Sequence, residues 1–211
     1  SLTPHLALKF MKDQKQFLQH FPMSLRPQAQ DLITVWAFYT IVKALYHHNT
    51  IPWKTIMISG YVLDPLGEKM SKSKGNVVDP TLIMDAYCGD ALRYWAASTK
   101  LGEDISYQER DLKTGQKFIT KLWNSARFTF EMIKDYGGKK PDHFELIDIW
   151  MLSKLQKIIQ ECTDYFEHYE FSKARVALEA FFWHTFCDNY IEIVKNRFYD
   201  EHRKEAKKAA Q

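Results

Sequence analysis

Three closely spaced lysines make residues 67–76 the part of this sequence that is best suited to chemistry. Serines lie between them and a Gly-Asn pair ends the stretch, which reads Gly67-Glu68-Lys69-Met70-Ser71-Lys72-Ser73-Lys74-Gly75-Asn76. Ammonium groups act as point charges on phosphate oxygens, and serine hydroxyls and loop N–H groups donate hydrogen bonds to the same anion. The pattern predicts a cationic loop that binds a polyphosphate. The alternative is a solvated basic turn or an import-type patch.

The segments that precede the lysines are predicted to place them at the end of a strand. Residues 21–25 have the character of a short strand, and the apolar spacing of residues 31–46 predicts a helix. Residues 53–62 are continuous and β-branched, which predicts a buried strand that ends at the turn of residues 64–67. Strand, helix and strand form a crossover unit, so we expect parallel strands in an α/β layer. Ligands of such layers bind beyond the carboxyl ends of the strands, where the lysines begin.

The second half of the sequence has apolar residues at helical spacing almost throughout. This spacing predicts helices over residues 112–133, 150–169 and 172–198, with Ser172 as the N-cap of the third. Three such helices favour an antiparallel bundle. We therefore expect an α/β domain over residues 1–110 and an all-α domain over residues 111–211, whose last helix continues past the end of the chain.

The composition is that of a soluble globular protein, since 45% of the 211 residues are hydrophobic and 26% are charged. The net charge of +3 decides nothing about nucleic-acid binding. No apolar run approaches the ~20 residues of a transmembrane helix. Three widely spaced cysteines without a CxxC pair argue against a disulfide framework or a zinc ribbon and favour a cytoplasmic location: Cys88, Cys162 and Cys187.

One pair of residues in the second half has a spacing that can ligate zinc. His184 and Cys187 stand three residues apart on a predicted helix. The sequence offers no second pair to complete such a site, so packing of Cys187 in a core is the favoured interpretation. We predict no metal site.

The five residues Lys69-Met70-Ser71-Lys72-Ser73 match the KMSKS signature of the class I aminoacyl-tRNA synthetases letter for letter. The surrounding sequence resembles the valyl members of that family over nearly the whole chain, and isoleucyl members tend to carry Leu where Lys74 stands. The stretches that carry the resemblance are residues 25–31, 36–40, 60–78, 90–93, 121–124, 127–128, 183–184 and 187–192. The resemblance implies the second half of a Rossmann-like catalytic domain followed by an anticodon-binding helical bundle.

The resemblance also implies a role for the loop. In the family, the KMSKS loop closes over ATP, and its lysines stabilise charge on the pyrophosphate as the amino-acid carboxylate attacks the α-phosphorus. By resemblance Lys69 and Lys72 are catalytic, Asp31 holds the ribose and the strand around Tyr61 frames the adenine. Ala29 replaces the glycine of the usual Gly-x-Asp pair. The implied ATP contacts are Lys69, Met70, Ser71, Lys72, Ser73, Asp31, Gly60 and Val62.

The activity implied by the resemblance is that of a valine–tRNA ligase that uses ATP with Mg²⁺, valine and tRNA(Val). A membrane or a stable protein partner is not expected. The sequence has no HIGH-type motif, so we expect the chain to be part of an enzyme and inactive alone. The alternatives are an isoleucyl- or leucyl-tRNA synthetase and, from another class, a non-catalytic helical RNA-binding or assembly module.

Basic residues outside the apolar stripes of the second half are candidates for contacts with tRNA phosphates. Acidic residues are interleaved with them, so the helices have little net charge. Basic side chains on a helical surface are as easily part of a solvated face as of an RNA contact. The candidates are Lys113, Lys117, Lys121, Arg127, Lys195, Arg197, Arg203, Lys204, Lys207 and Lys208.

Overall fold

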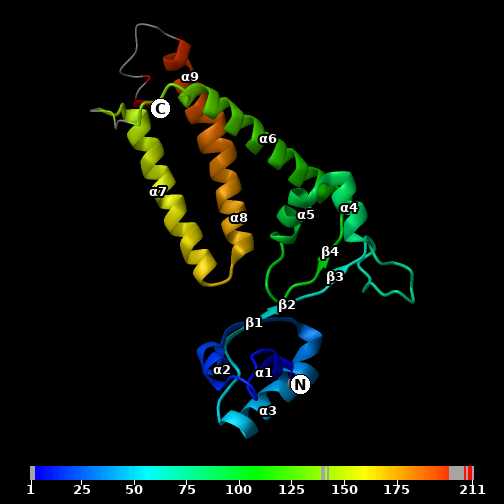
Figure 1. Ribbon diagram of the computed structural model, residues 1–211. Helices are drawn as coiled ribbons and strands as arrows, with labels where there is room; N and C mark the ends of the chain where they lie inside the picture. Colours follow the sequence, from blue (N-terminus) through cyan, green and yellow to red (C-terminus); the bar gives the residue numbers. More distant parts are fainter. Residues whose placement is uncertain (1–2, 139–140, 142, 200–206, 208, 211) are drawn as a thin grey trace. The chain divides into compact units, whose positions relative to one another are not determined.

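The computed structural model describes residues 3–138, 141, 143–199, 207 and 209–210. It divides into two compact units (Figure 1). Unit 1 consists of Ser1–Val78 and Thr99–Tyr107, and unit 2 of Asp79–Ser98 and Gln108–Gln211. Unit 1 contains the strands that the structure describes, whereas every described element of unit 2 is a helix. No helix in the described part of the chain is both long enough and apolar enough to cross a membrane.

Unit 1 is built around a strand–helix–strand crossover. Strands β1 and β2 pair in parallel, with Met23 opposite Trp53 and Ala29 opposite Ser59. Three consecutive helical segments connect them, which confirms the predicted crossover. The elements of unit 1 are α1 (Thr3–Ala7), α2 (Gln14–His20), β1 (Met23–Ala29), a 3₁₀ turn η1 (Gln30–Leu32), a π-helical turn η2 (Ile33–Ala37), α3 (Phe38–His48), β2 (Trp53–Ser59), β3 (Val62–Leu63) and β4 (Ile105–Ser106).

The strand predicted over residues 53–62 is interrupted, and it is less buried than expected. β2 ends at Ser59, the chain resumes as β3 at Val62, and only Trp53 of β2 is buried. The cause is a close approach of residues 99–107, because a Cβ atom at Gly60 would lie 2.1 Å from the carbonyl oxygen of Glu103. The chain therefore leaves β1 at this point, and β3 pairs in parallel with β4. The first strand also begins at Met23 rather than at residue 21.

The core of unit 1 is aromatic. Phe17 and Phe21 stack with ring centroids 4.7 Å apart beside the fully buried Ala44. The ring of His48, at the end of α3, lies 4.8 Å from Phe17 and 5.2 Å from the buried ring of His5. Burial lowers the pKa of both histidines, so they contribute to this cluster as neutral aromatic rings. The cluster packs α3 against α1 and α2.

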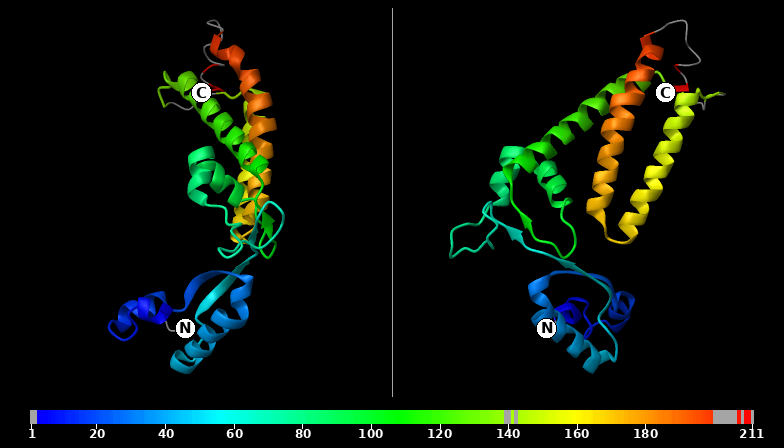
Figure 2. Two further views of the ribbon diagram at one scale, coloured as in Figure 1. Left: turned by 90° about the vertical axis from the view of Figure 1, so that its right-hand side faces the viewer. Right: turned by 180° about the vertical axis from the view of Figure 1, so that it is seen from behind.

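Unit 2 confirms the three long helices that the apolar spacing predicts. Helices α7 and α8 run antiparallel and side by side, joined by a short turn (Figures 1 and 2). α8 continues through η3 into α9, with a π-helical stretch in the middle. The elements are α4 (Pro80–Tyr87), α5 (Gly89–Ala96), α6 (Glu109–Ile133), α7 (Leu146–Glu167), α8 (Phe171–Ala180), η3 (Phe181–Ile191) and α9 (Glu192–Tyr199).

The predicted N-cap of the third helix is wrong by two residues. α8 begins at Phe171 with Glu170 as the N-cap residue, and Ser172 is buried within the first turn. The physical reason is that the turn after α7 is short and tight, with the Glu170 N–H bonded to the carbonyl of Tyr165 at 2.7 Å. Ser172 therefore already lies inside the helix.

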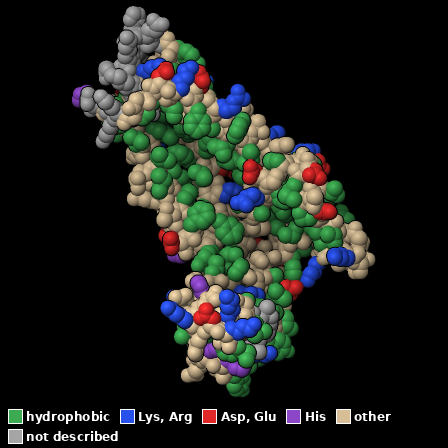
Figure 3. Space-filling model, in the orientation of Figure 1, with side chains coloured by type: hydrophobic (Ala, Val, Ile, Leu, Met, Phe, Trp, Pro, Cys, Tyr) green, Lys and Arg blue, Asp and Glu red, His purple; other side chains and the backbone are tan. Residues whose placement is uncertain are grey.

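The helices of unit 2 bury one aromatic cluster and expose many other apolar side chains. Phe182, Cys187 and Ile191 form the buried cluster, with Phe118 and Phe128 packed against it. Side chains such as Trp123 and Phe130 on α6 and Phe166 on α7 are more than 60% exposed. Hydrophobic side chains accordingly gather on the face of these helices that Figure 3 shows.

A buried charged network ties the start of α7 to α9. Arg197 and Asp148 are each 2% exposed, and Nη1 of Arg197 donates to both carboxylate oxygens of Asp148 at 2.9 Å. Nη2 lies 2.8 Å from the carboxylate of Glu145. The Tyr190 hydroxyl donates to Asp148 at 3.0 Å, and burial raises the pKa of that hydroxyl. Arg197 therefore drops out of the candidates for contact with tRNA phosphate, because its guanidinium is enclosed and already paired.

Removal of the carboxylate of this network should destabilise unit 2. Asp148→Ala leaves the Arg197 guanidinium buried with its bidentate partner missing, and we expect a loss of about 3–5 kcal/mol in the free energy of unfolding. Denaturant unfolding of the purified chain measures it. Lys195→Ala, which removes a largely exposed i,i+3 pair with Glu192, should have a far smaller effect. Equal losses in the two variants would contradict this account of the network.

Candidate functional site

The lysine loop, residues 67–76, lies within unit 1 and follows β3, the short strand that continues the chain after β2 of the crossover. Leu63, the last residue of β3, also pairs with Lys69 across an antiparallel bridge, so the intervening residues form a tight turn. At the far end of the loop, Gly75 has a φ of 71°, a backbone conformation that L side chains rarely adopt. The loop is thus closed by a bridge at one end and by a glycine turn at the other.

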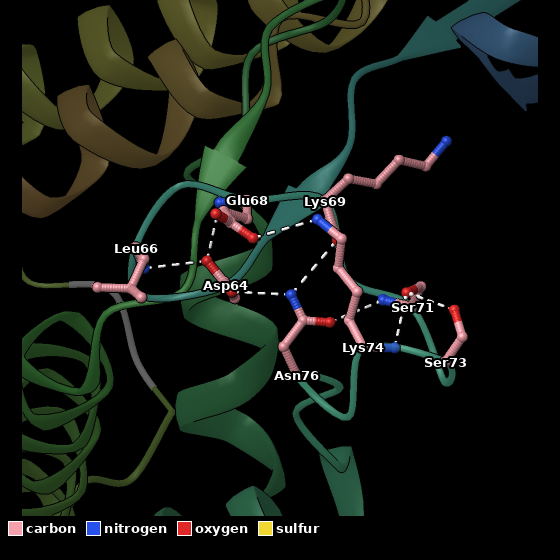
Figure 4. A network of polar contacts seen from close by, with 8 residues as sticks. All are labelled: Asp64, Leu66, Glu68, Lys69, Ser71, Ser73, Lys74 and Asn76. Atoms are coloured by element: carbon pink, nitrogen blue, oxygen red, sulfur yellow. Dashed lines mark hydrogen bonds and ion pairs between the residues drawn. The ribbon is translucent and has the colours of Figure 1, made fainter.

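The base of the loop is joined by a hydrogen-bonded network around Asp64 and Asn76, which we call the loop neck (Figure 4). Asp64 is 5% exposed, and its Oδ1 accepts from the backbone N–H groups of Leu66 at 3.0 Å and Glu68 at 2.8 Å. Its Oδ2 accepts from Nδ2 of Asn76 at 2.8 Å. The Asn76 amide, and after it the N–H of Glu68, lowers the pKa of Asp64. The carboxylate of the neck is therefore ionised at neutral pH.

Asn76 connects this carboxylate to the first residues of the loop. Its Oδ1 accepts from the Ser71 N–H at 2.9 Å, and its Nδ2 also lies 3.4 Å from the carbonyl oxygen of Lys69. Sequence reasoning did not single out Asp64 or Asn76 as site residues. The available signal was their position, since one opens the turn before the KMSKS residues and the other directly follows the Gly that ends the loop.

Lys69 lies where three of the predicted site residues come together. Its Nζ is 3.9 Å from the centre of the Tyr61 ring and 3.7 Å from Oδ2 of Asp31. Contact with Tyr61 is the main cause that raises the pKa of Lys69, and Asp31 adds to it. The side chains of Lys69 and Asp31 are 59% and 45% exposed, so the pair is open to solvent and to a ligand. Figure 4 shows the Lys69 side chain directed away from the loop neck.

The other two lysines of the loop differ in their partners. Nζ of Lys74 lies 3.2 Å from the Glu68 carboxylate, and both side chains are more than half exposed. Lys72 is exposed, and no acidic side chain of the described residues forms an ion pair with it. Lys72 is therefore the loop lysine whose charge is available to an incoming anion. An ammonium without a local counter-ion can bind a phosphate oxygen without first giving up another partner.

The remaining predicted ATP contacts lie on either side of these lysines. The hydroxyls of Ser71 and Ser73 are 3.2 Å apart, and Ser71 Oγ accepts from the Lys74 N–H. Met70 is half-buried, with its sulfur 3.5 Å from the Val78 N–H. The predicted strand contacts flank Tyr61, since Gly60 lies against Glu103 and Val62 starts β3. The structure thus brings Asp31, Tyr61 and Lys69 into contact, and it places Lys72 and Ser73 farther out on the loop.

The predicted packing of Cys187 is confirmed, because its side chain is 3% exposed in the core of unit 2. His184 on the same helix is exposed, with its Nδ1 3.4 Å from the Asp188 carboxylate. In the part of the chain that the structure describes, no three His, Cys, Asp or Glu side chains form a group that could hold a metal ion.

The basic residues proposed for tRNA contacts differ in exposure and in their partners. Lys113 pairs with Glu109 at 2.9 Å and Lys195 pairs with Glu192, which reduces their availability. Lys117 and Arg127 on α6 are exposed, and Lys121 is half-buried with its Nζ 5.4 Å from the Trp183 ring centre. Lys207 is half-buried. Arg203, Lys204 and Lys208 lie outside the described residues.

Comparison with known proteins agrees with this geometry. Residues 1–108 match the family described as tRNA synthetases class I (I, L, M and V), and residues 148–211 match the anticodon-binding domain of tRNA ligase. The chain is 46% identical to the valine–tRNA ligase of Rickettsia felis over 97% of this chain and 25% of the relative. It is 42% identical to that of Wolbachia pipientis wMel over 94% of this chain and 24% of the relative. The chain thus spans about a quarter of the length of these relatives.

Solved structures confirm the fold. Methionyl-tRNA synthetase of Mycobacterium tuberculosis in complex with methionyl-adenylate superposes with a TM-score of 0.76 and 22% identity, over 94% of this chain and 40% of that one. A LeuRS–tRNA–LeuAMS ternary complex from Agrobacterium radiobacter K84 gives a TM-score of 0.66 and 18% identity, over 90% of this chain and 24% of that one. These likenesses show the fold, a Rossmann-like portion followed by a helical portion. Together with the family match over residues 1–108, they show that this chain belongs to the class I tRNA synthetases.

Proposed function

We propose that this chain is the part of a valine–tRNA ligase that holds the triphosphate of ATP and begins the tRNA-binding bundle. The observation that carries the proposal is the exposed ammonium of Lys72, without an acidic partner among the described residues, on a loop of KMSKS sequence at a strand end. The identity of 42–46% to valine–tRNA ligases favours valine over leucine or isoleucine as the amino acid.

The proposed reaction is activation of valine. A valine carboxylate oxygen forms a bond to the α-phosphorus of ATP, and the bond from that phosphorus to the bridging oxygen breaks. Pyrophosphate leaves with the electron pair of that bond. The loop supplies charge where the leaving group becomes more negative, and a charge that is already in place needs no reorganisation during the step. Lys72 has this role in the proposal, with Lys69 as the second catalytic lysine.

Lys69 must exchange one anion for another to take part. In the present arrangement its ammonium neutralises Asp31, the residue proposed for the ATP ribose. A ribose hydroxyl at Asp31 would take the place of Lys69, whose flexible side chain could then reach the triphosphate. The exposed position of both groups supports such an exchange, because an exposed ion pair contributes little to stability.

The other proposed contacts follow from the same placement. Gly60, Tyr61 and Val62 would frame adenine through their backbone, while Met70, Ser71 and Ser73 would contribute the remaining contacts of the loop. Mg²⁺ would arrive with the nucleotide, whose phosphate oxygens are suitable ligands for it, and no side chain of this chain is assigned to hold it. The three thiols are free, which supports a reducing compartment such as the cytoplasm.

The helical part would bind tRNA(Val). We place the functional boundary near residue 110, with the catalytic portion over residues 1–110 and the anticodon-binding portion over residues 111–211. The family match to an anticodon-binding domain over residues 148–211 supports this division. Lys117 and Arg127 on α6 are exposed, so we propose them as phosphate contacts. Arg197 is buried and is not included.

Loss of the Lys72 ammonium should slow activation of valine. In a full-length ligase that contains this sequence, Lys72→Ala should lower the rate of valyl-adenylate formation about 100- to 1,000-fold, the usual effect of removing one transition-state charge donor. Affinity for valine should change little. Pre-steady-state kinetics measures the step, and Lys43→Ala on the exposed side of α3 is the matched control. An unchanged rate in Lys72→Ala would remove Lys72 from the mechanism.

Binding of tRNA should weaken with salt. The logarithm of the binding constant should fall by about 0.7–0.9 per logarithmic unit of salt for each phosphate contacted. Lys117→Ala should reduce this slope by the amount that corresponds to about one phosphate contact. Lys113→Ala should reduce it less, because the Lys113 ammonium is paired with Glu109. The titration compares tRNA carrying a valine anticodon with a control whose anticodon is altered. Salt-dependent binding without a preference would favour a generic RNA-binding module over the ligase.

A further inference from the structure

We propose that Asp64 and Asn76 are positioning residues that set the shape of the lysine loop for valine activation. The inference rests on the proposed function, and it concerns the loop neck defined above. In this proposal neither side chain supplies charge to ATP. Their role is to hold the backbone from Lys69 to Ser71 at a defined place beside the end of β3.

The contacts of the neck fall on both sides of Met70. Asn76 accepts from the Ser71 N–H at 2.9 Å and donates toward the Lys69 carbonyl at 3.4 Å, so one side chain reaches the backbone before and after this residue. The same amide donates to Asp64 at 2.8 Å. Both catalytic lysines of the proposed function adjoin these backbone contacts. A shift of the neck therefore moves Lys69 and Lys72 together.

The Asp64 carboxylate is committed to the protein. It is 5% exposed, and its oxygens accept from Leu66, Glu68 and Asn76 at 2.8–3.0 Å. With three donors on its two oxygens and little exposure, this carboxylate is engaged by the loop itself. These hydrogen bonds compensate for its burial, and a lost partner would leave a buried acceptor unsatisfied.

The loop also contains an ion pair between Glu68 and Lys74, which is too exposed to hold the loop backbone in place. The Glu68–Lys74 ion pair lies at 3.2 Å, but its side chains are 59% and 56% exposed. Pairs of this kind contribute little, because water screens the charges and two long side chains lose freedom. Glu68 contributes to the neck through its backbone N–H instead. This contrast supplies a control, because Glu68→Gln removes the ion pair and keeps the neck.

The polarity of the neck gives a stringent test. Asn76→Asp places two carboxylates at hydrogen-bond distance, and Asp64→Asn places two amide donors face to face. The double variant Asp64→Asn with Asn76→Asp reverses donor and acceptor. It restores the bond across the neck and still offers an oxygen to the Ser71 N–H, but it loses the longer contact with the Lys69 carbonyl oxygen, so we expect partial recovery. Each single variant should therefore be impaired and the double variant should recover in part, an outcome that a general loss of folding would not produce.

The experiment uses the full-length ligase that contains this sequence, with valine-dependent pyrophosphate exchange as the activity. We expect Asn76→Asp and Asp64→Asn each to lower kcat about 10- to 100-fold, since misplacement of a positioning group by about 1 Å has effects of that size. KM for valine should change little, and Glu68→Gln should behave as the unaltered enzyme. Amide hydrogen exchange of residues 69–76 is the second readout, and it should speed up in both single variants and slow again in the double variant.

The outcomes separate this proposal from the proposed function. Full activity and unchanged amide exchange in the single variants would overturn the positioning role. Loss of activity without recovery in the double variant would overturn it as well. Lys72→Ala serves as the reference. If Lys72→Ala lowers the exchange rate and the neck variants do not, only the neck proposal fails. If Lys72→Ala is also without effect, the proposed function itself fails.

Discussion

The close approach of residues 99–107 to Gly60 is the constraint on which the rest of the site depends. A side chain at position 60 would meet the Glu103 carbonyl, so the strand breaks there and resumes toward β4. The next residue, Asp104, accepts from the Tyr61 N–H at 2.7 Å and from the Gln30 side chain at 3.3 Å. One carboxylate thus holds the break in the strand beside the start of the crossover helix. This arrangement lets Lys69 contact both the Tyr61 ring and the Asp31 carboxylate.

Local partners give chemically identical lysines different roles. Lys69 is held by an aromatic ring and a carboxylate, Lys74 pairs with Glu68, and no acid of the described residues pairs with Lys72. A loop in which every lysine was unpaired would be repelled by its own charge, whereas full pairing would leave nothing for phosphate. The observed distribution keeps one charge available and keeps a second in a contact that solvent can reach.

Local patterns in the sequence predicted the crossover, the long helices of unit 2 and the cationic loop, because each depends on residues close together in the chain. The errors arose where partners are distant. The break at Gly60 depends on Glu103, and the Tyr61–Asp104 bond spans 43 residues. Arg197 stood among the candidates for RNA contact because its partner Asp148 lies 49 residues earlier, beyond the reach of local patterns. The neck was missed because Asp64 and Asn76 meet only once the loop between them has folded back.

Burial distinguishes the ion pairs that hold the fold from those that a substrate can replace. Arg197 and Asp148 are 2% exposed, so separating them would leave two charges in a poorly solvated interior. Lys69 and Asp31 are about half exposed, so water can solvate each of them when they part. The loop neck differs from both pairs, because Asp64 is buried but its partners are neutral N–H groups. Neutral donors hold a loop in place without using its lysines, which leaves their charge for the proposed nucleotide.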